Sequence, residues 1–175
     1  MAGLLAFFFR DPERVIPADP ALLYAPADGR VVRIERVEAP ELGGPAWRIA
    51  IFLSLFDVHI NRSPAAGIVR RVEYRPGRFQ TAWEPGVEGR NERNTISIDT
   101  PGGPILVLQI AGLVARRIVC YPRPGTAVRS GDRIGLIKFS SRTDLLIPAG
   151  LAQPIVPLGQ RVFAGVTPIA AWGAR

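Results

Sequence analysis

Glycine and proline interrupt this chain throughout, and this feature constrains its fold most strongly. The 175 residues include 18 glycines and 17 prolines, which act as turn signals about every ten residues. Neither residue suits the interior of a helix, so long helices are disfavoured. The sequence therefore predicts many short strands that are separated by turns.

Several runs between these turns have the composition of strands, and the run Val31–Val37 also alternates in its later part like a half-buried strand. The other strand-like runs are Trp47–Leu55, Gly67–Tyr74, Thr95–Asp99, Pro104–Ala111, Ala115–Tyr121, Arg133–Phe139 and Asp144–Ile147. We expect a mainly β (β-rich α+β) fold with sandwich- or barrel-like sheets of short strands and few short helices. The length suits a single domain over residues 1–175.

A short pattern, Pro-x-x-Gly-x-Val, occurs twice, beginning at Pro26 and at Pro64. It is similar to the turn modules of lipoyl- and biotin-carrier domains, and it predicts lipoyl-like hairpin modules within the sheets. A carrier of this kind needs a modified lysine at an exposed hairpin tip. Lys138 is the one lysine of the sequence, so a lipoyl-like carrier or binding module is one alternative for the function.

The net charge of +7, from 22 basic and 15 acidic residues, favours an anionic partner. Aromatic residues are few and do not interleave with arginine, so we expect a membrane surface and no nucleic acid. The apolar run Leu4–Phe9, followed by Arg10, would either dip into a bilayer interface or pack on the core or a partner subunit. No run is long enough to span a membrane. We expect a peripheral protein on the cytoplasmic side of the cell membrane.

His59 is the one histidine of the sequence and its natural candidate for a base near neutral pH. It lies in an apolar run, where the alternative is a buried core histidine with satisfied ring nitrogens. Asp57, two residues earlier, would share a strand face with His59 and is one candidate to orient the ring. The single cysteine, Cys120, excludes a cysteine-based zinc site, and we expect no metal site.

The segment Phe52–Pro64, which contains His59, resembles a signature of phosphatidylserine decarboxylases. A second segment, Ile137–Pro148, resembles the site at which those proenzymes cut their own backbone. The resemblance covers roughly residues 8–148. It extends to three further segments, Phe7–Arg14, Pro26–Arg30 and Asn91–Asn94.

The resemblance implies a catalytic set of Asp28, His59 and Ser141. Ser141 would attack the carbonyl of Ser140, His59 would act as base, and Asp28 would orient His59 in preference to Asp57. Cleavage between residues 140 and 141 would give a β subunit, 1–140, and an α subunit, 141–175, that remain together. Taken alone, Asp28 would be read as a turn residue.

The resemblance also implies a cofactor, a pyruvoyl group made from Ser141. Its carbonyl would form a Schiff base with the amine of an anionic serine phospholipid and accept electrons as carbon dioxide leaves. His59 would then return a proton. The lipid would be phosphatidylserine or an archaeal-type analogue, and a homodimer is compatible with the resemblance.

Ser140 departs from the family pattern, which usually has glycine before the cleaved serine. Glycine tolerates strained backbone and close approach, so serine at this position should slow the cut. Pyruvoyl-dependent histidine decarboxylases nevertheless cut between two serines. The second alternative for the function is therefore an uncleaved, inactive family member that only binds lipid.

Overall fold

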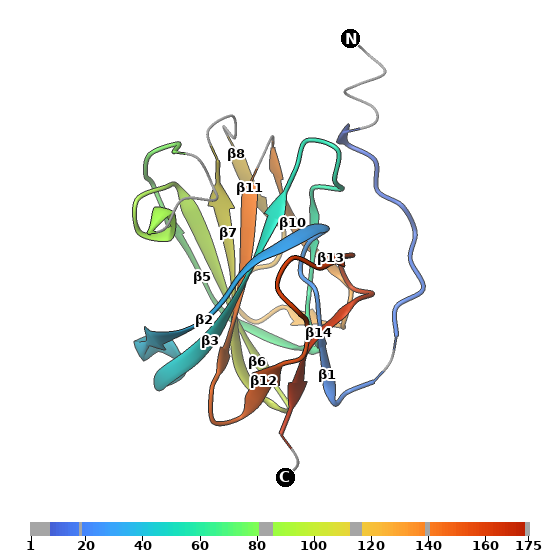
Figure 1. Ribbon diagram of the computed structural model, residues 1–175, viewed down its shortest axis with the longest axis vertical. Helices are drawn as coiled ribbons and strands as arrows, with labels where there is room; N and C mark the ends of the chain where they lie inside the picture. Colours follow the sequence, from blue (N-terminus) through green and yellow to red (C-terminus); the bar gives the residue numbers. More distant parts are fainter. Residues whose placement is uncertain (1–7, 18, 81–85, 113–116, 139–140, 174–175) are drawn as a thin grey trace.

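The computed structural model describes residues 8–17, 19–80, 86–112, 117–138 and 141–173. Most of this part of the chain is antiparallel β-structure, and its largest element is a curled eight-stranded sheet (Figure 1). The strand order in this sheet is β13 (Arg161–Val162), β2 (Gly29–Ala39), β3 (Gly44–Leu53), β11 (Ser141–Pro148), β7 (Gly103–Ala111), β6 (Arg93–Thr100), β5 (Gly67–Arg75) and β9 (Ala127–Val128).

Two three-stranded sheets complete the described structure. One has the order β1 (Leu22–Tyr24), β14 (Pro168–Trp172) and β12 (Ala152–Pro154), and the other has the order β4 (Ile60–Arg62), β10 (Arg133–Lys138) and β8 (Arg117–Cys120). The helical elements of the described residues are two single 3-10 turns, η1 (Pro40–Leu42) and η2 (Val87–Gly89). The prediction of a mainly β fold with barrel-like sheets is confirmed.

Alternation along the strands builds the main core. Ile49 and Ile51 of β3, together with Leu145 and Ile147 of β11, point to one face of the large sheet and pack in the largest cluster of buried apolar residues. Leu146 points to the other face and belongs to a second cluster. Every residue of β11 is buried, so this strand is covered on both faces.

The repeated Pro-x-x-Gly-x-Val pattern marks strand starts, because its glycines, Gly29 and Gly67, are the first residues of β2 and β5. Gly29 has a φ of 147°, and a Cβ atom there would lie 2.1 Å from the carbonyl oxygen of Phe52. The Asp-Gly turn therefore requires glycine at this position. Within the described residues, no helix combines the length and the apolar character needed to cross a membrane.

Candidate functional site

Ser141 is the first residue of β11 and lies between Leu53 of β3 and Ala111 of β7. Its side chain is fully buried, and its Oγ has no hydrogen-bond partner among the described residues. A buried hydroxyl without a partner is unfavourable by about 1–3 kcal/mol, so such an atom calls for an explanation. A reactive role is one such explanation.

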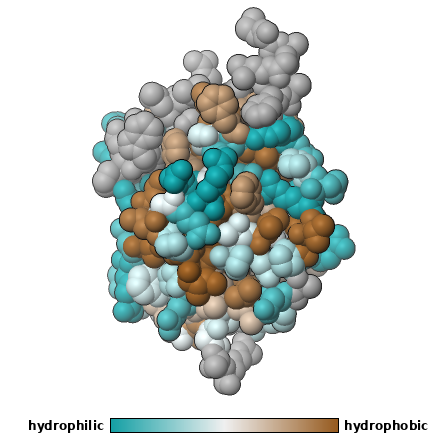
Figure 2. Space-filling view, turned by 45° about the vertical axis from the view of Figure 1, so that its right-hand side comes forward, coloured by the Kyte–Doolittle hydropathy of each residue, from teal (hydrophilic) through white to brown (hydrophobic). Residues whose placement is uncertain are grey.

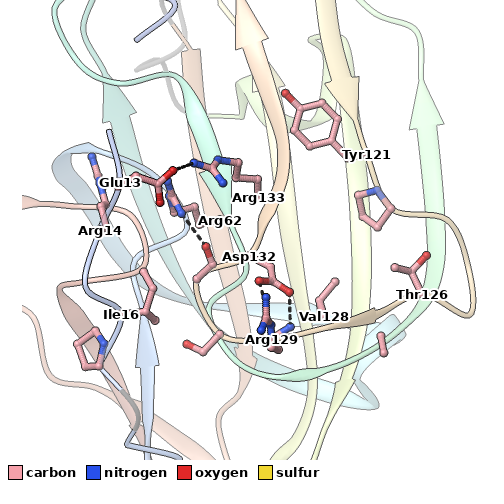
Figure 3. Close-up of a pocket in the computed structure, with 15 residues that line it drawn as sticks. Glu13, Arg14, Ile16, Arg62, Tyr121, Thr126, Val128, Arg129, Asp132 and Arg133 are labelled. Atoms are coloured by element: carbon pink, nitrogen blue, oxygen red, sulfur yellow. Dashed lines mark hydrogen bonds and ion pairs between the residues drawn. The ribbon is translucent and has the colours of Figure 1, made fainter. Parts of the chain in front are cut away.

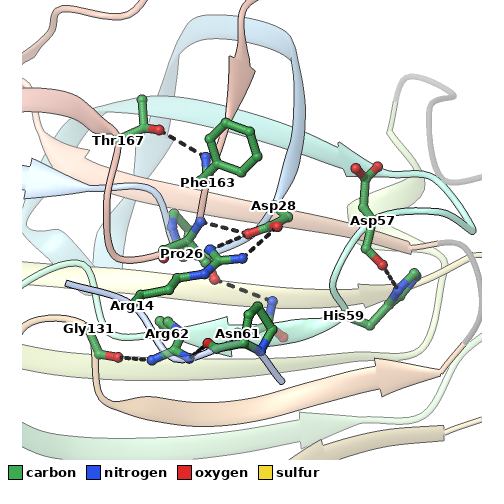
Figure 4. Close-up of polar contacts among 12 residues, drawn as sticks. Arg14, Pro26, Asp28, Asp57, His59, Asn61, Arg62, Gly131, Phe163 and Thr167 are labelled. Carbon is green, nitrogen blue, oxygen red and sulfur yellow. Dashed lines mark hydrogen bonds and ion pairs between the residues drawn. The ribbon is translucent and has the colours of Figure 1, made fainter. Parts of the chain in front are cut away.

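His59 lies between β3 and β4, six residues after Leu53, and its ring is buried. Its Nδ1 lies 2.9 Å from the carbonyl oxygen of Asp57 (Figure 4). Because a carbonyl can only accept, Nδ1 carries the proton and Nε2 carries the free lone pair. Nε2 is buried and has no hydrogen-bond partner in the described structure, so it is the nitrogen that can take a proton.

The environment of His59 keeps the ring neutral. Burial lowers its pKa to about 4, although the hydrogen bond to Asp57 and the charges of Asp57 and Asp28 act in the opposite direction. The ring of Phe8 covers it, with 4.1 Å between the ring centroids, and the charge of Arg10 also lowers the pKa. At pH 7 the residue therefore has an available lone pair on Nε2.

Asn61 joins the three segments that carry the predicted site residues. Its Nδ2 donates to Thr143 Oγ1 at 3.0 Å and has a longer contact of 3.5 Å with the carbonyl oxygen of Pro26. Asn61 follows His59 by two residues, Thr143 follows Ser141 by two, and Pro26 precedes Asp28 by two. Two residues of strand span about 7 Å, so this side chain brings the three segments to one place.

A chain of hydrogen bonds between buried side-chain amides holds Asn61 in place. Gln109 Nε2 donates to Asn61 Oδ1 at 2.9 Å, and Asn94 Nδ2 donates to Gln109 Oε1 at 2.9 Å. All three amides are at most 3% exposed. The chain runs from β6 through β7 to β4, and it fixes Asn61 in one orientation.

Asp28 is engaged with Arg14. The guanidinium donates to both carboxylate oxygens, at 2.6 and 2.8 Å, and the main-chain N–H of Ala164 donates to Oδ1 at 2.8 Å (Figure 4). The described hydrogen-bond partners of this carboxylate are thus Arg14 and Ala164. Its effect on His59 is electrostatic, because its negative charge raises the pKa of the ring. Its role in orienting His59 stays a prediction.

Asp57, the competing candidate, contacts His59 through its main-chain carbonyl. Its carboxylate accepts hydrogen bonds from the N–H and Oγ of Ser54 and from Arg161 Nη2 at 2.6 Å. It therefore shapes the loop that leads to His59. Ser140 lies outside the described residues.

The sequence analysis missed a second buried group, on the opposite face of β11 from Ser141. Arg142 donates to both carboxylate oxygens of Asp144 at 2.8 Å and to Glu88 Oε2 at 2.8 Å. Complete burial raises the pKa of Asp144, and the charge of Arg142 opposes that shift. The Arg-x-Asp spacing, which places both side chains on one strand face, was the signal available in the sequence.

One cleft among the described residues is separate from this site. It has a volume of about 740 Å³, lies between the N-terminal segment and the turns around β9, and contains none of the three predicted catalytic residues (Figure 3). Its arginines are paired: Arg133 with Glu13, for example, and Arg129 with Asp132. No group of three or more His, Cys, Asp or Glu side chains in the described structure is placed to hold a metal ion.

Comparison with known proteins gives a consistent result. Residues 1–170 match the family model described as phosphatidylserine decarboxylase. The phosphatidylserine decarboxylase proenzyme of Gluconacetobacter diazotrophicus is 49% identical over 173 residues, which are 96% of this chain and 76% of the relative. The proenzyme of Symbiobacterium thermophilum is 50% identical over 174 residues (97% and 80%), and that of Granulibacter bethesdensis is 50% identical over 169 residues (94% and 69%).

Proposed function

Because this chain belongs to the phosphatidylserine decarboxylase family, a family of carboxy-lyases, we propose that it decarboxylates the serine headgroup of phosphatidylserine after cutting its own backbone between Ser140 and Ser141. The observation that carries the proposal is a pair of buried reactive atoms without hydrogen-bond partners among the described residues, His59 Nε2 and Ser141 Oγ. The segments that carry these two atoms are joined by the hydrogen bond between Asn61 and Thr143.

The cut would proceed in balanced steps. Ser141 Oγ attacks the carbonyl carbon of Ser140, and His59 Nε2 takes the hydroxyl proton. His59 then gives that proton to the departing nitrogen as the peptide C–N bond breaks, which leaves an ester and a free amine. Loss of the Cα proton of residue 141 then releases the carboxylate of fragment 1–140 and leaves a dehydroalanine. Water adds and ammonia leaves, so residue 141 ends as a pyruvoyl ketone.

A pyruvoyl group at position 141 would supply a carbonyl that accepts electrons during decarboxylation. The position of residue 141 fits this group, because it is buried between strands β3 and β7, which would hold the group in one place. His59 would hold the proton to be returned to the substrate carbon. Because burial lowers the pKa of His59, the ring is neutral at pH 7 and would carry this proton only transiently; its protonated form is a stronger acid than free imidazolium, which favours that return.

The two fragments would stay together. Strand β11, in fragment 141–175, pairs along its length with β3 and along most of it with β7, and both partners belong to fragment 1–140. The ion pair between Arg142 and Glu88 also crosses the cut. Separation would expose a strand that is buried on both faces.

Intact-mass measurement on the purified full-length chain, paired with an assay of carbon dioxide release from phosphatidylserine vesicles, tests the proposal. We expect fragments 1–140 and 141–175, the second with a carbonyl at its N-terminus that reacts with hydrazine. Ser141→Ala and His59→Ala should leave the chain uncut, whereas Ser97→Ala, on β6, should be cut normally. Decarboxylation by an uncut chain would refute the pyruvoyl mechanism. An uncut chain without activity would support the inactive lipid-binding alternative.

A further inference from the structure

Four arginines line a cavity on one face of the large sheet, outside the candidate site. The cavity has a volume of about 430 Å³, which is in the range of small-molecule sites, and most of the residues around it belong to β5 and β6 (Figure 1). Its cations are Arg70, Arg71, Arg75 and Arg93, and its carboxylates are Glu41 and Glu73. We call it the arginine cavity.

Two of these arginines, Arg75 and Arg93, lie directly opposite one another in the antiparallel pair of β5 and β6. Side chains at such positions start about 5 Å apart, and like charges there repel. One carboxylate serves two of the cations, because Glu73 accepts a hydrogen bond from Arg75 Nε at 2.7 Å and pairs with Arg71 Nη2 at 2.7 Å. The described hydrogen-bond partner of Arg93 is neutral, the carbonyl oxygen of Glu88. The cavity therefore has an excess of positive charge.

The guanidinium groups keep donors for a ligand. Arginine carries five N–H donors in a planar fork that matches the geometry of a phosphate group. In the described contacts, Arg75 uses Nε and Arg93 uses Nη1, so most of their donors are available. Thr95 and Ser97 of β6 also line the cavity and add hydroxyl groups. Guanidinium and hydroxyl donors around one cavity are typical of a site that binds phosphate.

Arg93 is held in place before any ligand binds. Its Nη1 donates to the carbonyl oxygen of Glu88 at 2.7 Å, and the Glu88 carboxylate accepts hydrogen bonds from Arg48 and Arg142, each at 2.8 Å. The η2 turn is thus anchored to β3 and β11, and Arg93 is anchored to that turn. A fixed donor loses less conformational entropy on binding than a mobile one. The Arg75 side chain is 54% exposed and can turn towards an anion that enters.

Hydrophilic and hydrophobic residues are interleaved on the side of the molecule that Figure 2 shows, as on an ordinary protein surface. The arginine cavity differs, because its guanidinium and hydroxyl groups surround one volume. We propose that the arginine cavity binds a small phosphorylated molecule, with the phosphate group between Arg75 and Arg93. A phosphate monoester carries close to two negative charges at pH 7 and would neutralise both guanidinium groups. The proposal is independent of the proposed function, because the cavity contains none of Asp28, His59 and Ser141.

Isothermal titration calorimetry of the full-length chain with inorganic phosphate tests the proposal, at low ionic strength and in a buffer without other oxyanions. We expect saturable binding to one site and a higher melting temperature when phosphate is present. Arg75→Gln/Arg93→Gln should bind phosphate at least about tenfold more weakly, a loss of about 1.4 kcal/mol, because it removes charge-assisted hydrogen bonds on both sides of the anion.

The matched control is Arg123→Gln/Arg129→Gln. It removes the same charge from exposed positions on either side of β9, which pairs with the opposite end of β5 from Arg75. The control should bind phosphate within about twofold of wild type. An equal loss of affinity in the two double variants, or no saturable phosphate binding by the wild-type chain, would overturn the proposal.

Glu73→Gln tests the site without removing a cation. The change removes the carboxylate that competes with phosphate for Arg71 and Arg75, so phosphate should bind at least about threefold more tightly. A role of Glu73 in the fold alone would lower the melting temperature and leave the affinity unchanged. This variant decides the question even if the double arginine variant does not fold, since unchanged or weaker binding of phosphate would contradict the proposal.

A second measurement separates free phosphate from the phosphate of a lipid headgroup. Vesicles of phosphatidylcholine with phosphatidylglycerol present phosphodiesters, which carry a single negative charge each. We expect the loss of Arg75 and Arg93 to weaken the binding of free phosphate. Vesicle binding that depends on these two arginines, in a chain that does not bind free phosphate, would assign the cavity to a lipid headgroup and overturn the proposed ligand.

Discussion

Replacing Thr143 by valine tests whether the Asn61–Thr143 hydrogen bond aligns the site. The substitution keeps the branched shape and removes Oγ1, the acceptor 3.0 Å from Asn61 Nδ2. Among the described residues, the Nδ2 donor of Asn61 then retains only its 3.5 Å contact with the carbonyl oxygen of Pro26. Because Asn61 and Thr143 are fully buried, the unsatisfied donor should lower the free energy of unfolding by about 1–3 kcal/mol. For a chain of this size the melting temperature should fall by roughly 2–12 °C.

The same change should slow self-cleavage by at least about tenfold, since a displacement of about 1 Å can reduce a reaction rate about a hundredfold. Thr143→Ser is the matched control. It keeps the hydroxyl and removes one methyl group, which lowers stability by about 1 kcal/mol. Stability is best measured by thermal unfolding in a Ser141→Ala background, where the chain stays whole. Cleavage rates are measured by intact mass in the chain with Ser141 intact.

The decisive comparison is between variants of similar stability. Slow cleavage in Thr143→Val with near-normal cleavage in Thr143→Ser supports an aligning role for the hydrogen bond. If both variants lose stability and both cleave at the wild-type rate, the hydrogen bond serves only the fold, and the alignment argument is wrong.

Three other changes give distinct outcomes. Phe8→Ala should rehydrate His59 and raise its pKa from about 4, so the acid limb of a plot of cleavage rate against pH should move to higher pH. The stability contributed by the neutral His59 ring is complete above pH 6.5 and is lost as the pH falls from 6.5 towards 4. Urea titrations should find this pH dependence weaker in Phe8→Ala. Arg142→Met should lower the free energy of unfolding by about 3–5 kcal/mol, because it leaves the Asp144 carboxylate buried without its main partner, and Arg142→Met/Asp144→Leu should recover most of that loss in the same measurement. Ser140→Gly should speed cleavage in an intact-mass time course, and an unchanged rate would show that residue 140 does not limit it.

Some features could be predicted from the sequence because they depend on local chemistry. Gly29 and Gly67 begin strands at the repeated turn pattern, and the strand-like apolar run Trp47–Leu55 covers most of β3. The family followed from two motif segments and is confirmed by the match over residues 1–170. These signals lie within a few residues of the feature that they predict.

Other features depend on pairing between distant strands and could not be predicted in this way. Asn61 lies in the segment Phe52–Pro64, but its partner Thr143 is 82 residues away, and no local pattern predicts that the two side chains meet. The pairing of Asp28 with Arg14 likewise depends on the path of the N-terminal segment across the sheets. From the sequence alone, a charged strand residue such as Arg142 would be predicted to be exposed. Its burial follows from the covering of β11 on both faces, which the sequence does not show locally.

The place of the proposed cut explains how a chain could be broken in its interior and keep its shape. Ser141 is the first residue of β11, so the bond before it lies at the start of the ladders with β3 and β7. Cleavage there would remove one covalent link and leave those ladders in place from Ser141 onward. A cut after Arg142 would instead put Ser141 at the loose end of fragment 1–142, away from the strand that holds it. A cut at the proposed position would thus leave the new terminus next to the strand that follows His59, where the hydrogen bond between Asn61 and Thr143 would join the two fragments.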